Sequence, residues 1–340
     1  MEIKLTGEIE SYLDRCRRHI QEDKKNNFLG MHVTKTTEHQ VQKQMQEADF
    51  AEFAGSEDTW PSLFLSTDEW KNSPYHSHVS LDLVKNAHFS YETQRTAGHE
   101  LFNTDAIQKD PHRELNDWMK LRAMDNNFDA IYLFQDEKDW MMDAPSEAAT
   151  NDVPAAKAHG NILTFGLGIG YFLYMALQNP NVTSITCIEN SPQVIEMFQR
   201  FLYPQFPHNK VVNIIEGDAY LLFNKDYFSQ FDYVFTDIWQ SSQDGLVCIE
   251  KLLMQYLPPF EKADFWIEDS CLEILWTLTF LYFDAKAHHH ACKVNPAYVS
   301  LLQKVSCYYD SINLIIDTVE PLKFYIYDTK TIRKILSQPK

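Results

Sequence analysis

Residues 161–170 read NILTFGLGIG, an apolar run followed by three glycines at alternate positions. The apolar half predicts a buried strand, and the glycine-rich half predicts a tight turn that leads into a helix. Only 10 of the 340 residues are glycine, and Gly160, Gly166, Gly168, Gly170 and Gly217 all belong to this part of the chain. A chain that uses glycine so sparingly elsewhere is expected to need it here for backbone reasons.

The chain beyond this turn alternates apolar runs with helical stretches, which is the pattern of a parallel sheet with crossover helices. The predicted strands are Asn161–Phe165, Ser184–Ile188, Lys210–Ile215, Tyr233–Thr236 and Phe265–Ile267. The predicted helices between them are Gly170–Gln178, Pro192–Phe201, Ala219–Phe223 and Gly245–Leu257. Farther along, Ser270–Phe283 predicts a buried helix and Ala297–Ser306 predicts another.

The first part of the chain has a different pattern. A surface helix is indicated by apolar residues at helical spacing, namely Ile9, Tyr12, Leu13, Cys16 and Ile20. Short runs rich in Val, Phe, Tyr and Trp between residues 60 and 142 predict β-hairpins around His78–Leu83, Ala87–Thr93 and Ala130–Phe134, with a helix near Arg113–Met124. We therefore predict an N-terminal α+β domain over residues 1–145 and a second domain over residues 146–340.

Charge and composition exclude several classes of protein. The chain has 30 Lys and Arg against 48 Asp and Glu, a net charge of −18, and no basic patch is evident, so we expect no nucleic-acid partner. The longest uncharged apolar run, Ile274–Phe283, is about half of the ~20 residues that a membrane span needs, so we expect no membrane partner. Six separated cysteines without a Cys-x-x-Cys pair favour reduced thiols and a cytoplasmic location.

The glycine spacing bears on the class of ligand. A dinucleotide-binding fingerprint, Gly-x-Gly-x-x-Gly, would need glycine at position 171, where this chain has Tyr171. The pattern Gly-x-Gly-x-Gly instead allows the backbone to approach a ligand that lies across the turn, with amide groups donating from the start of the next helix. A close contact between strand and helix is the structural alternative.

Acidic residues follow the next three predicted strands. Glu189 ends the second strand about 20 residues after the turn, where both carboxylate oxygens could accept hydrogen bonds from ribose hydroxyls. Asp218 follows the third strand and Asp237 follows the fourth. Open α/β sheets bind ligands outside the carboxyl ends of their strands, so we expect these acids to meet in one crevice. For each acid alone, a solvated position at a strand end is the alternative.

Together these motifs resemble the class I S-adenosylmethionine-dependent methyltransferase superfamily over roughly residues 160–283, and within it most of all the spermidine synthase branch. The resemblance implies an α/β fold, a Rossmann-like methyltransferase sheet with helices on both faces, preceded by a smaller β-rich α+β N-terminal domain. Residues 146–340 would then form a domain that binds S-adenosylmethionine and carries a C-terminal helical extension.

The resemblance also implies roles for individual residues. The cofactor would be bound by Phe165, Gly166, Gly168, Gly170, Glu189, Asp218 and Ala219. Asp237 and Trp239 would face the transfer site as candidate catalytic residues, and the substrate would contact Trp140, Glu147 and Tyr171. Residues 140–147, WMMDAPSE, occupy the position of a gate-like segment. Ordinary core packing remains the alternative for the aromatic residues, and capping of the helix after Pro145 is the alternative for Glu147.

Two departures from the spermidine synthase pattern matter for the reaction. Aminopropyltransferases have an acid inside the glycine loop, whereas this loop has Leu167 and Ile169. After the fourth strand, residues 237–240 read DIWQ and keep only the first carboxylate of the family motif. We therefore predict a methyltransferase that acts on a small acceptor, with an amine-bearing molecule as the candidate. An aminopropyltransferase and a catalytically silent binding module are the alternatives, and a homodimer is possible.

One further group of residues invites comparison with a metal site. His288, His289 and His290 are followed by Cys292. Adjacent histidines point in different directions, and the sequence offers no second group of ligands that would complete a tetrahedron. From the sequence we predict a solvated loop at these residues and no bound metal.

Overall fold

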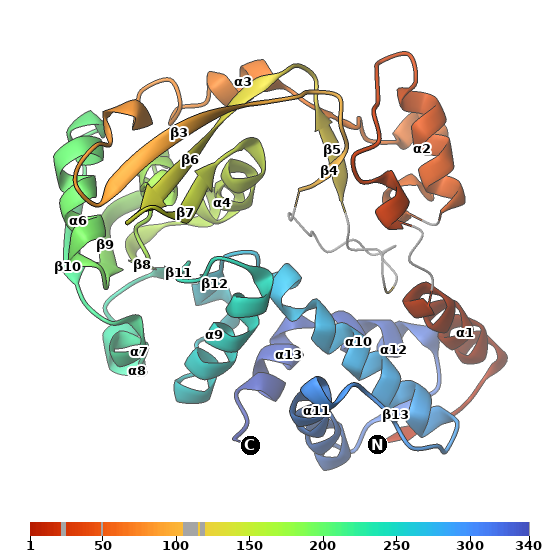
Figure 1. Ribbon diagram of the computed structural model, residues 1–340. Helices are drawn as coiled ribbons and strands as arrows, with labels where there is room; N and C mark the ends of the chain where they lie inside the picture. The colour runs from red at the N-terminus through yellow and green to blue at the C-terminus, as the bar shows by residue number, and fades with distance from the viewer. Residues whose placement is uncertain (22–24, 49, 105–114, 116–119, 340) are drawn as a thin grey trace.

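A computed structural model describes the chain except for residues 22–24, 49, 105–114, 116–119 and 340 (Figure 1). Its centre is a parallel sheet of five strands in the order β10-β9-β8-β11-β12. The strands are β8 (Gly160–Phe165), β9 (Val182–Glu189), β10 (Val211–Glu216), β11 (Tyr233–Thr236) and β12 (Ala263–Phe265). Four of the predicted strands are confirmed, and the fifth begins and ends two residues earlier than predicted. The strand order reverses at β8, where the glycine turn follows.

Helices cover both faces of this sheet. They are α5 (Tyr171–Gln178), α6 (Pro192–Met197), α7 (Ala219–Leu222), α8 (Lys225–Phe228) and α9 (Ser242–Gln255), with a π-helical turn, Phe198–Leu202, after α6. Phe172 of α5 stacks on Phe235 of β11, with ring centroids 4.2 Å apart. The neighbouring residue in the sheet, Phe165, points to the opposite face and contacts Phe223 and Phe228. The Rossmann-like arrangement inferred from the sequence is therefore present.

The C-terminal extension is helical. It consists of α10 (Glu268–Ala287), α11 (Val299–Ser311), α12 (Val319–Tyr327) and α13 (Thr329–Leu336). The prediction of a buried helix is confirmed in α10, where residues such as Trp276 and Phe280 are fully buried. None of the helices in the described part of the chain combines the length and the apolar composition that a membrane span needs.

The first residues of the chain lie against this extension. Strand β1 (Glu2–Ile3) pairs in parallel with β13 (Ile315–Ile316). Helix α1 (Gly7–Gln21) buries the predicted apolar positions Ile9, Tyr12, Leu13 and Cys16 completely. Figure 1 shows α1 beside α10 and α12, two helices that come much later in the sequence. The division of the chain at residue 145 stays a prediction, and β1 and α1 do not follow it.

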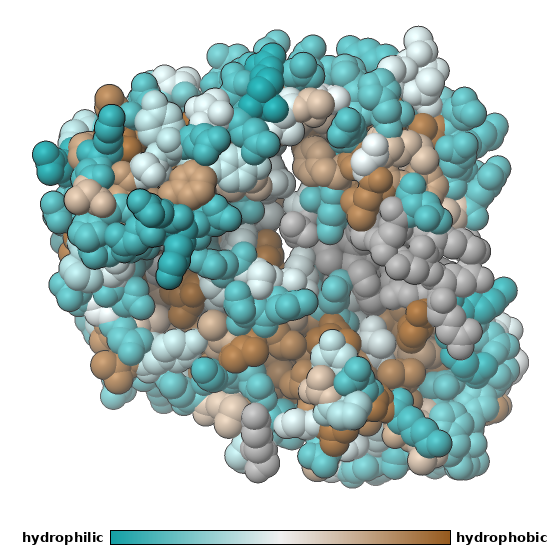
Figure 2. Space-filling model, viewed as in Figure 1, coloured by the Kyte–Doolittle hydropathy of each residue, from teal (hydrophilic) through white to brown (hydrophobic). Residues whose placement is uncertain are grey.

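Two small sheets lie between residues 64 and 143. Strands β3 (Phe89–Thr96), β6 (Phe128–Gln135) and β7 (Lys138–Asp143) form an antiparallel sheet, and β2 (Phe64–Leu65), β4 (Phe102–Asn103) and β5 (Leu121–Met124) form the other. Helix α2 (Glu38–Glu47) precedes them, α3 (Thr67–Lys71) follows β2, and α4 (Pro145–Lys157) leads into β8. Figure 2 shows that hydrophilic side chains dominate this face of the molecule, with hydrophobic ones gathered around its central hollow.

Two predictions for this region were wrong. The helix expected near residues 113–124 is a strand over 121–124, because these residues pair with β2 and β4; most of the earlier part of that prediction lies outside the described residues. Residues 78–83 form no strand. Leu81–Leu83 is a 3-10 turn, and its backbone is anchored through hydrogen bonds of Ser80 with the Gln205 side chain.

Candidate functional site

The glycine turn after β8 is held close to the neighbouring strands. The Gly166 amide donates to the Ile188 carbonyl of β9 at 2.9 Å, and the Asp237 amide donates to the Phe165 carbonyl at 2.9 Å. Gly166 has φ +93°, and a Cβ atom there would lie 1.8 Å from the Asp237 carbonyl oxygen. Gly170 caps α5 at φ +76°, where a Cβ would meet the Phe198 ring at 2.4 Å. Both positions therefore require glycine.

Glu189 stands at the carboxyl end of β9 beside this turn. Its Oε2 accepts from the Leu167 amide at 3.1 Å, and its Oε1 accepts from the Ser191 amide at 2.8 Å. The side chain therefore ties the glycine turn to the start of α6. A carboxylate offers about four lone-pair sites, so two remain for ligand hydroxyl groups.

Asp218 caps the short helix α7 and accepts from the Tyr220 amide at 2.8 Å. The residue before it, Gly217, donates its amide to the Glu189 carbonyl at 2.9 Å. This bond brings the ends of β9 and β10 together and places Asp218 and Ala219 on the wall of the same cavity as Glu189.

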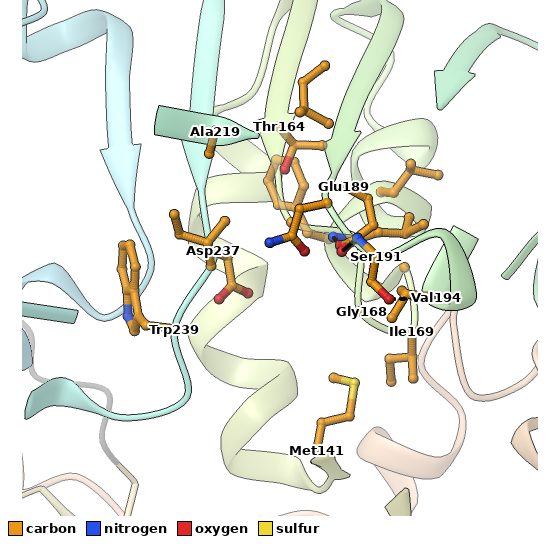
Figure 3. A pocket seen from close by; sticks show the side chains of 18 of the residues that line it. Met141, Thr164, Gly168, Ile169, Glu189, Ser191, Val194, Ala219, Asp237 and Trp239 are labelled. Atoms are coloured by element: carbon orange, nitrogen blue, oxygen red, sulfur yellow. Dashed lines mark hydrogen bonds between the residues drawn. The ribbon is translucent and has the colours of Figure 1, made fainter. Parts of the chain in front are cut away.

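That cavity has a volume of about 640 Å³ and lies at the carboxyl ends of the parallel strands (Figure 3). Figure 3 shows Glu189 on one wall, Asp237 with Trp239 on another, and Met141 of β7 across from them. Glu189, Asp218 and Asp237 all line it, and none of the described residues that line it is Lys, Arg or His. A cavity of this size suits a small-molecule ligand, and its carboxylates favour a cationic one.

A second cavity of about 250 Å³ adjoins the first. The two share lining residues, including Trp140, Tyr171, Asp237 and Trp239. The second cavity also has acidic and aromatic members that the first lacks, namely Asp143, Glu147 and Trp266. The described residues around it again include no Lys, Arg or His.

Asp237 lies where the two cavities meet. Burial and the nearby Glu147 carboxylate raise its pKa to about 8, because both disfavour a second negative charge at this place. The carboxyl group therefore keeps its proton to a higher pH than an ordinary aspartate does. A cation bound beside it would favour the carboxylate and lower the pKa.

Asn151 of α4 contributes a polar atom to both cavities. Its Nδ2 donates to the Glu147 carbonyl at 3.1 Å, whereas its buried Oδ1 has no hydrogen-bond partner among the described residues. An unpaired buried acceptor costs free energy unless a ligand or water supplies a donor. Sequence reasoning missed Asn151, because a single asparagine in a helical stretch has no distinctive signal.

Two hydrogen-bonded pairs support the aromatic wall. The Tyr171 hydroxyl donates to Asp152 Oδ1 at 2.8 Å, which fixes the ring at the start of α5. Asp143, 3% exposed, is paired with His76 Nε2 at 2.9 Å. The His76 ring in turn lies 5.8 Å from the Tyr171 ring. No local sequence pattern indicates these pairs, because their members are far apart along the chain.

The structure brings most of the predicted site residues together. Gly166, Gly168, Gly170, Tyr171, Glu189, Asp218, Ala219, Asp237, Trp239 and Trp140 line the larger cavity, and Glu147 lines the smaller one. Phe165 is the exception, because its ring is fully buried under the sheet and does not line either cavity. Only its carbonyl group takes part, by accepting the Asp237 amide. The ligand roles of all these residues stay predictions.

No protein-family model matches the chain, and no curated protein matches it. Among solved structures, a spermidine synthase from Thermotoga maritima aligns at 15% identity and a TM-score of 0.27, over 37% of this chain and 48% of its own.

Two further solved structures align with similar scores. A probable spermidine synthase from Corynebacterium glutamicum aligns at 11% identity and a TM-score of 0.28, over 49% of this chain and 60% of its own. The human methyltransferase-like protein 13, solved with S-adenosylhomocysteine (SAH), aligns at 16% identity and a TM-score of 0.21, over 28% of this chain and 47% of its own. This chain thus spans about half the length of these proteins.

Proposed function

We propose that this chain is an S-adenosylmethionine-dependent methyltransferase that acts on a small, amine-bearing acceptor. The observation that carries the proposal is the convergence of Glu189, Asp218 and Asp237 with the glycine turn on one cavity, at the reversal point of a parallel sheet. Such reversal points are where open α/β sheets bind their ligands.

The residues present fit this cofactor better than a phosphate-bearing one. S-adenosylmethionine carries a sulfonium and an ammonium group, and both suit a cavity whose described lining has carboxylates and no basic side chain. A dinucleotide would bring a pyrophosphate against the same carboxylates. We assign the amino-acid end to the turn at Gly166–Gly170, the ribose to Glu189, and the adenine amino group to Asp218 beside Ala219.

When bound, the cofactor supplies an electrophilic methyl group. The protein would then hold the acceptor in line with that group and exclude water. Trp140, Tyr171 and Trp239 form the walls that would do so. In this proposal Asp237 would accept the proton that an ammonium group must lose before its nitrogen can act as a nucleophile.

The acceptor would enter through the smaller cavity. There Asp143, Glu147 and Asp237 stand among the rings of Trp140 and Trp266. Carboxylates attract an ammonium group, and aromatic faces stabilise it further. We therefore propose a small-molecule amine as the acceptor, with neither nucleic acid nor membrane as a partner, a cytoplasmic location, and a homodimer as a possible assembly.

Ligand-induced thermal stabilisation tests the cofactor assignment. S-adenosylmethionine and SAH should raise the melting temperature, and NAD should not, because stabilisation follows RT ln(1 + [L]/Kd). Incubation with methyl-labelled cofactor and a panel of amines then tests the reaction. Absence of any shift at millimolar cofactor would favour a silent module instead.

An aminopropyltransferase is the second candidate, because the three carboxylates around the smaller cavity would also suit a polyamine. The sulfur product separates the two reactions. Methyl transfer leaves SAH, whereas aminopropyl transfer leaves methylthioadenosine. Release of methylthioadenosine from the decarboxylated cofactor would overturn the methyltransferase proposal.

A further inference from the structure

A second group of ligand-type side chains lies at the end of α10, among the helices of the C-terminal extension. Asp284, His288 and His290 each offer one ligand atom, and these atoms lie within 4.8 Å of one another. Asp284 and His288 are four residues apart at the end of α10, and therefore share one face of it. His290 follows in the loop, and its backbone amide donates to the Ala285 carbonyl, which folds the loop back onto the helix.

The separations within the group are close to those between the ligands of a small metal ion. His288 Nδ1 lies 3.3 Å from Asp284 Oδ1, and His290 Nε2 lies 3.8 Å from Asp284 Oδ2. Zinc binds nitrogen and oxygen at ~2.0–2.2 Å, so two ligands of a tetrahedral ion are about 3.3–3.6 Å apart.

The surroundings of the group supply outer-shell partners and negative charge. Glu10 Oε2 lies 2.9 Å from His288 Nε2, an arrangement in which the carboxylate orients the ring and leaves Nδ1 for a metal. That Nδ1 lies 2.9 Å from the carbonyl oxygen of Asp284. Arg17 contacts Asp284 Oδ1 at 3.0 Å and also pairs with Asp14 and Glu10, so three carboxylates face one guanidinium group.

We propose that Asp284, His288 and His290 bind a divalent transition-metal ion, with zinc as the best match to one carboxylate and two imidazoles. His288 would use Nδ1 and His290 would use Nε2, with one carboxylate oxygen of Asp284 as the third ligand. A fourth position stays open toward solvent, since the His290 side chain is 54% exposed. Because Glu10 and Arg17 belong to α1, the ion would also reinforce the contact between α1 and α10.

This proposal changes the prediction made from the sequence. The three consecutive histidines do diverge, because His289 is outside the group, but His288 and His290 converge on Asp284. Asp284, the third member of the group, lies in α10 before the loop, and the sequence of the loop does not indicate that it takes part. Cys292, which the sequence places nearby, is not a member of the group.

Calorimetric titration of the full chain with Zn²⁺ tests the site, after removal of any affinity tag and dialysis against a chelator. We expect one equivalent to bind and the melting temperature to rise with Zn²⁺. His290→Ala should weaken binding about tenfold or more. His289→Ala is the matched control, an exposed neighbour outside the group, and should bind as the parent does. A tenfold excess of Mg²⁺ should not displace the zinc, because Mg²⁺ prefers oxygen ligands.

Three results would each overturn the proposal. These are no saturable binding to the parent chain, an equal loss in both histidine variants, and displacement of zinc by Mg²⁺, which would indicate only an acidic patch. His290 is exposed and its backbone bond to Ala285 does not depend on the side chain, so the His290→Ala chain should fold, and its melting temperature without metal checks this. S-adenosylmethionine binding lies outside this test and is measured separately.

Discussion

The carbonyl oxygen of Asp237 occupies the space where a side chain at position 166 would begin, since a Cβ on Gly166 would lie 1.8 Å from it. The backbone that carries the candidate catalytic carboxyl group is thus in contact with the backbone that would cradle the cofactor. The contact is reinforced by the hydrogen bond from the Asp237 amide to Phe165. A substitution at either position should therefore also displace the backbone at the other.

Gly166→Ala should disturb both stability and ligand binding. The alanine would have to adopt φ +93° and to push the Asp237 carbonyl away. The left-handed backbone alone costs roughly 1–2 kcal/mol. Chemical denaturation should show a loss of at least that size. Gly7→Ala is the control, because nothing lies within 4 Å of a Cβ at that position, and it should leave the free energy of unfolding nearly unchanged.

Glu189→Ala should weaken cofactor binding by about 1–3 kcal/mol, because it leaves the Leu167 and Ser191 amides and the ribose hydroxyls without their acceptor. Calorimetric titration with SAH measures the effect. Glu216→Ala is the matched control, since Glu216 pairs in register with Glu189 on β10 but does not line the cavity. An unchanged affinity in Glu189→Ala would refute the ribose assignment.

Asp237→Asn should abolish turnover and leave cofactor affinity near that of the parent chain. For the parent chain we expect kcat/KM to rise with pH up to about 8, because a proton acceptor must be ionised and the pKa of Asp237 is raised to about 8. A rate of Asp237→Asn equal to that of the parent would remove Asp237 from the mechanism.

The same carboxyl group predicts a change in stability with pH. Its pKa is higher in the folded chain than in the unfolded chain, so its stabilising contribution is complete below about pH 4 and is lost as pH rises through about 8. As pH rises from about 4 to about 8, the free energy of unfolding of Asp237→Asn should therefore increase relative to that of the parent chain. A constant difference across the range would show that Asp237 has an ordinary pKa.

Glu147→Gln should move the activity profile to lower pH. Removal of the Glu147 charge takes away one of the two causes that raise the pKa of Asp237. The acid limb of kcat/KM against pH measures the shift. Asp139→Asn, which changes an exposed acid on β7 outside both cavities, should leave the profile where it is.

The sheet could be predicted from the sequence because its signals are local. Apolar runs of four to eight residues separated by helical stretches identified β8 to β11, and the acids at their ends followed from parallel topology. Residues 121–124 were assigned wrongly because their conformation is set by pairing with β2 and β4, which no local pattern reveals.

The site was predicted in outline but not in its electrostatics. Glu189, Asp218 and Asp237 follow strands and could be placed on one edge of the sheet. The effect of Glu147 on Asp237, the unpaired Asn151 oxygen and the Asp143–His76 pair arise between segments that are distant in the sequence. Only the packing of α4 and β7 over the strand ends creates them.

The pairing of β1 with β13 joins residues 2–3 to residues 315–316. Contacts between such distant parts of a chain close a large loop and are therefore expected to form late in folding. During synthesis on the ribosome, β1 would therefore stay without its partner strand until residues 315–316 have emerged.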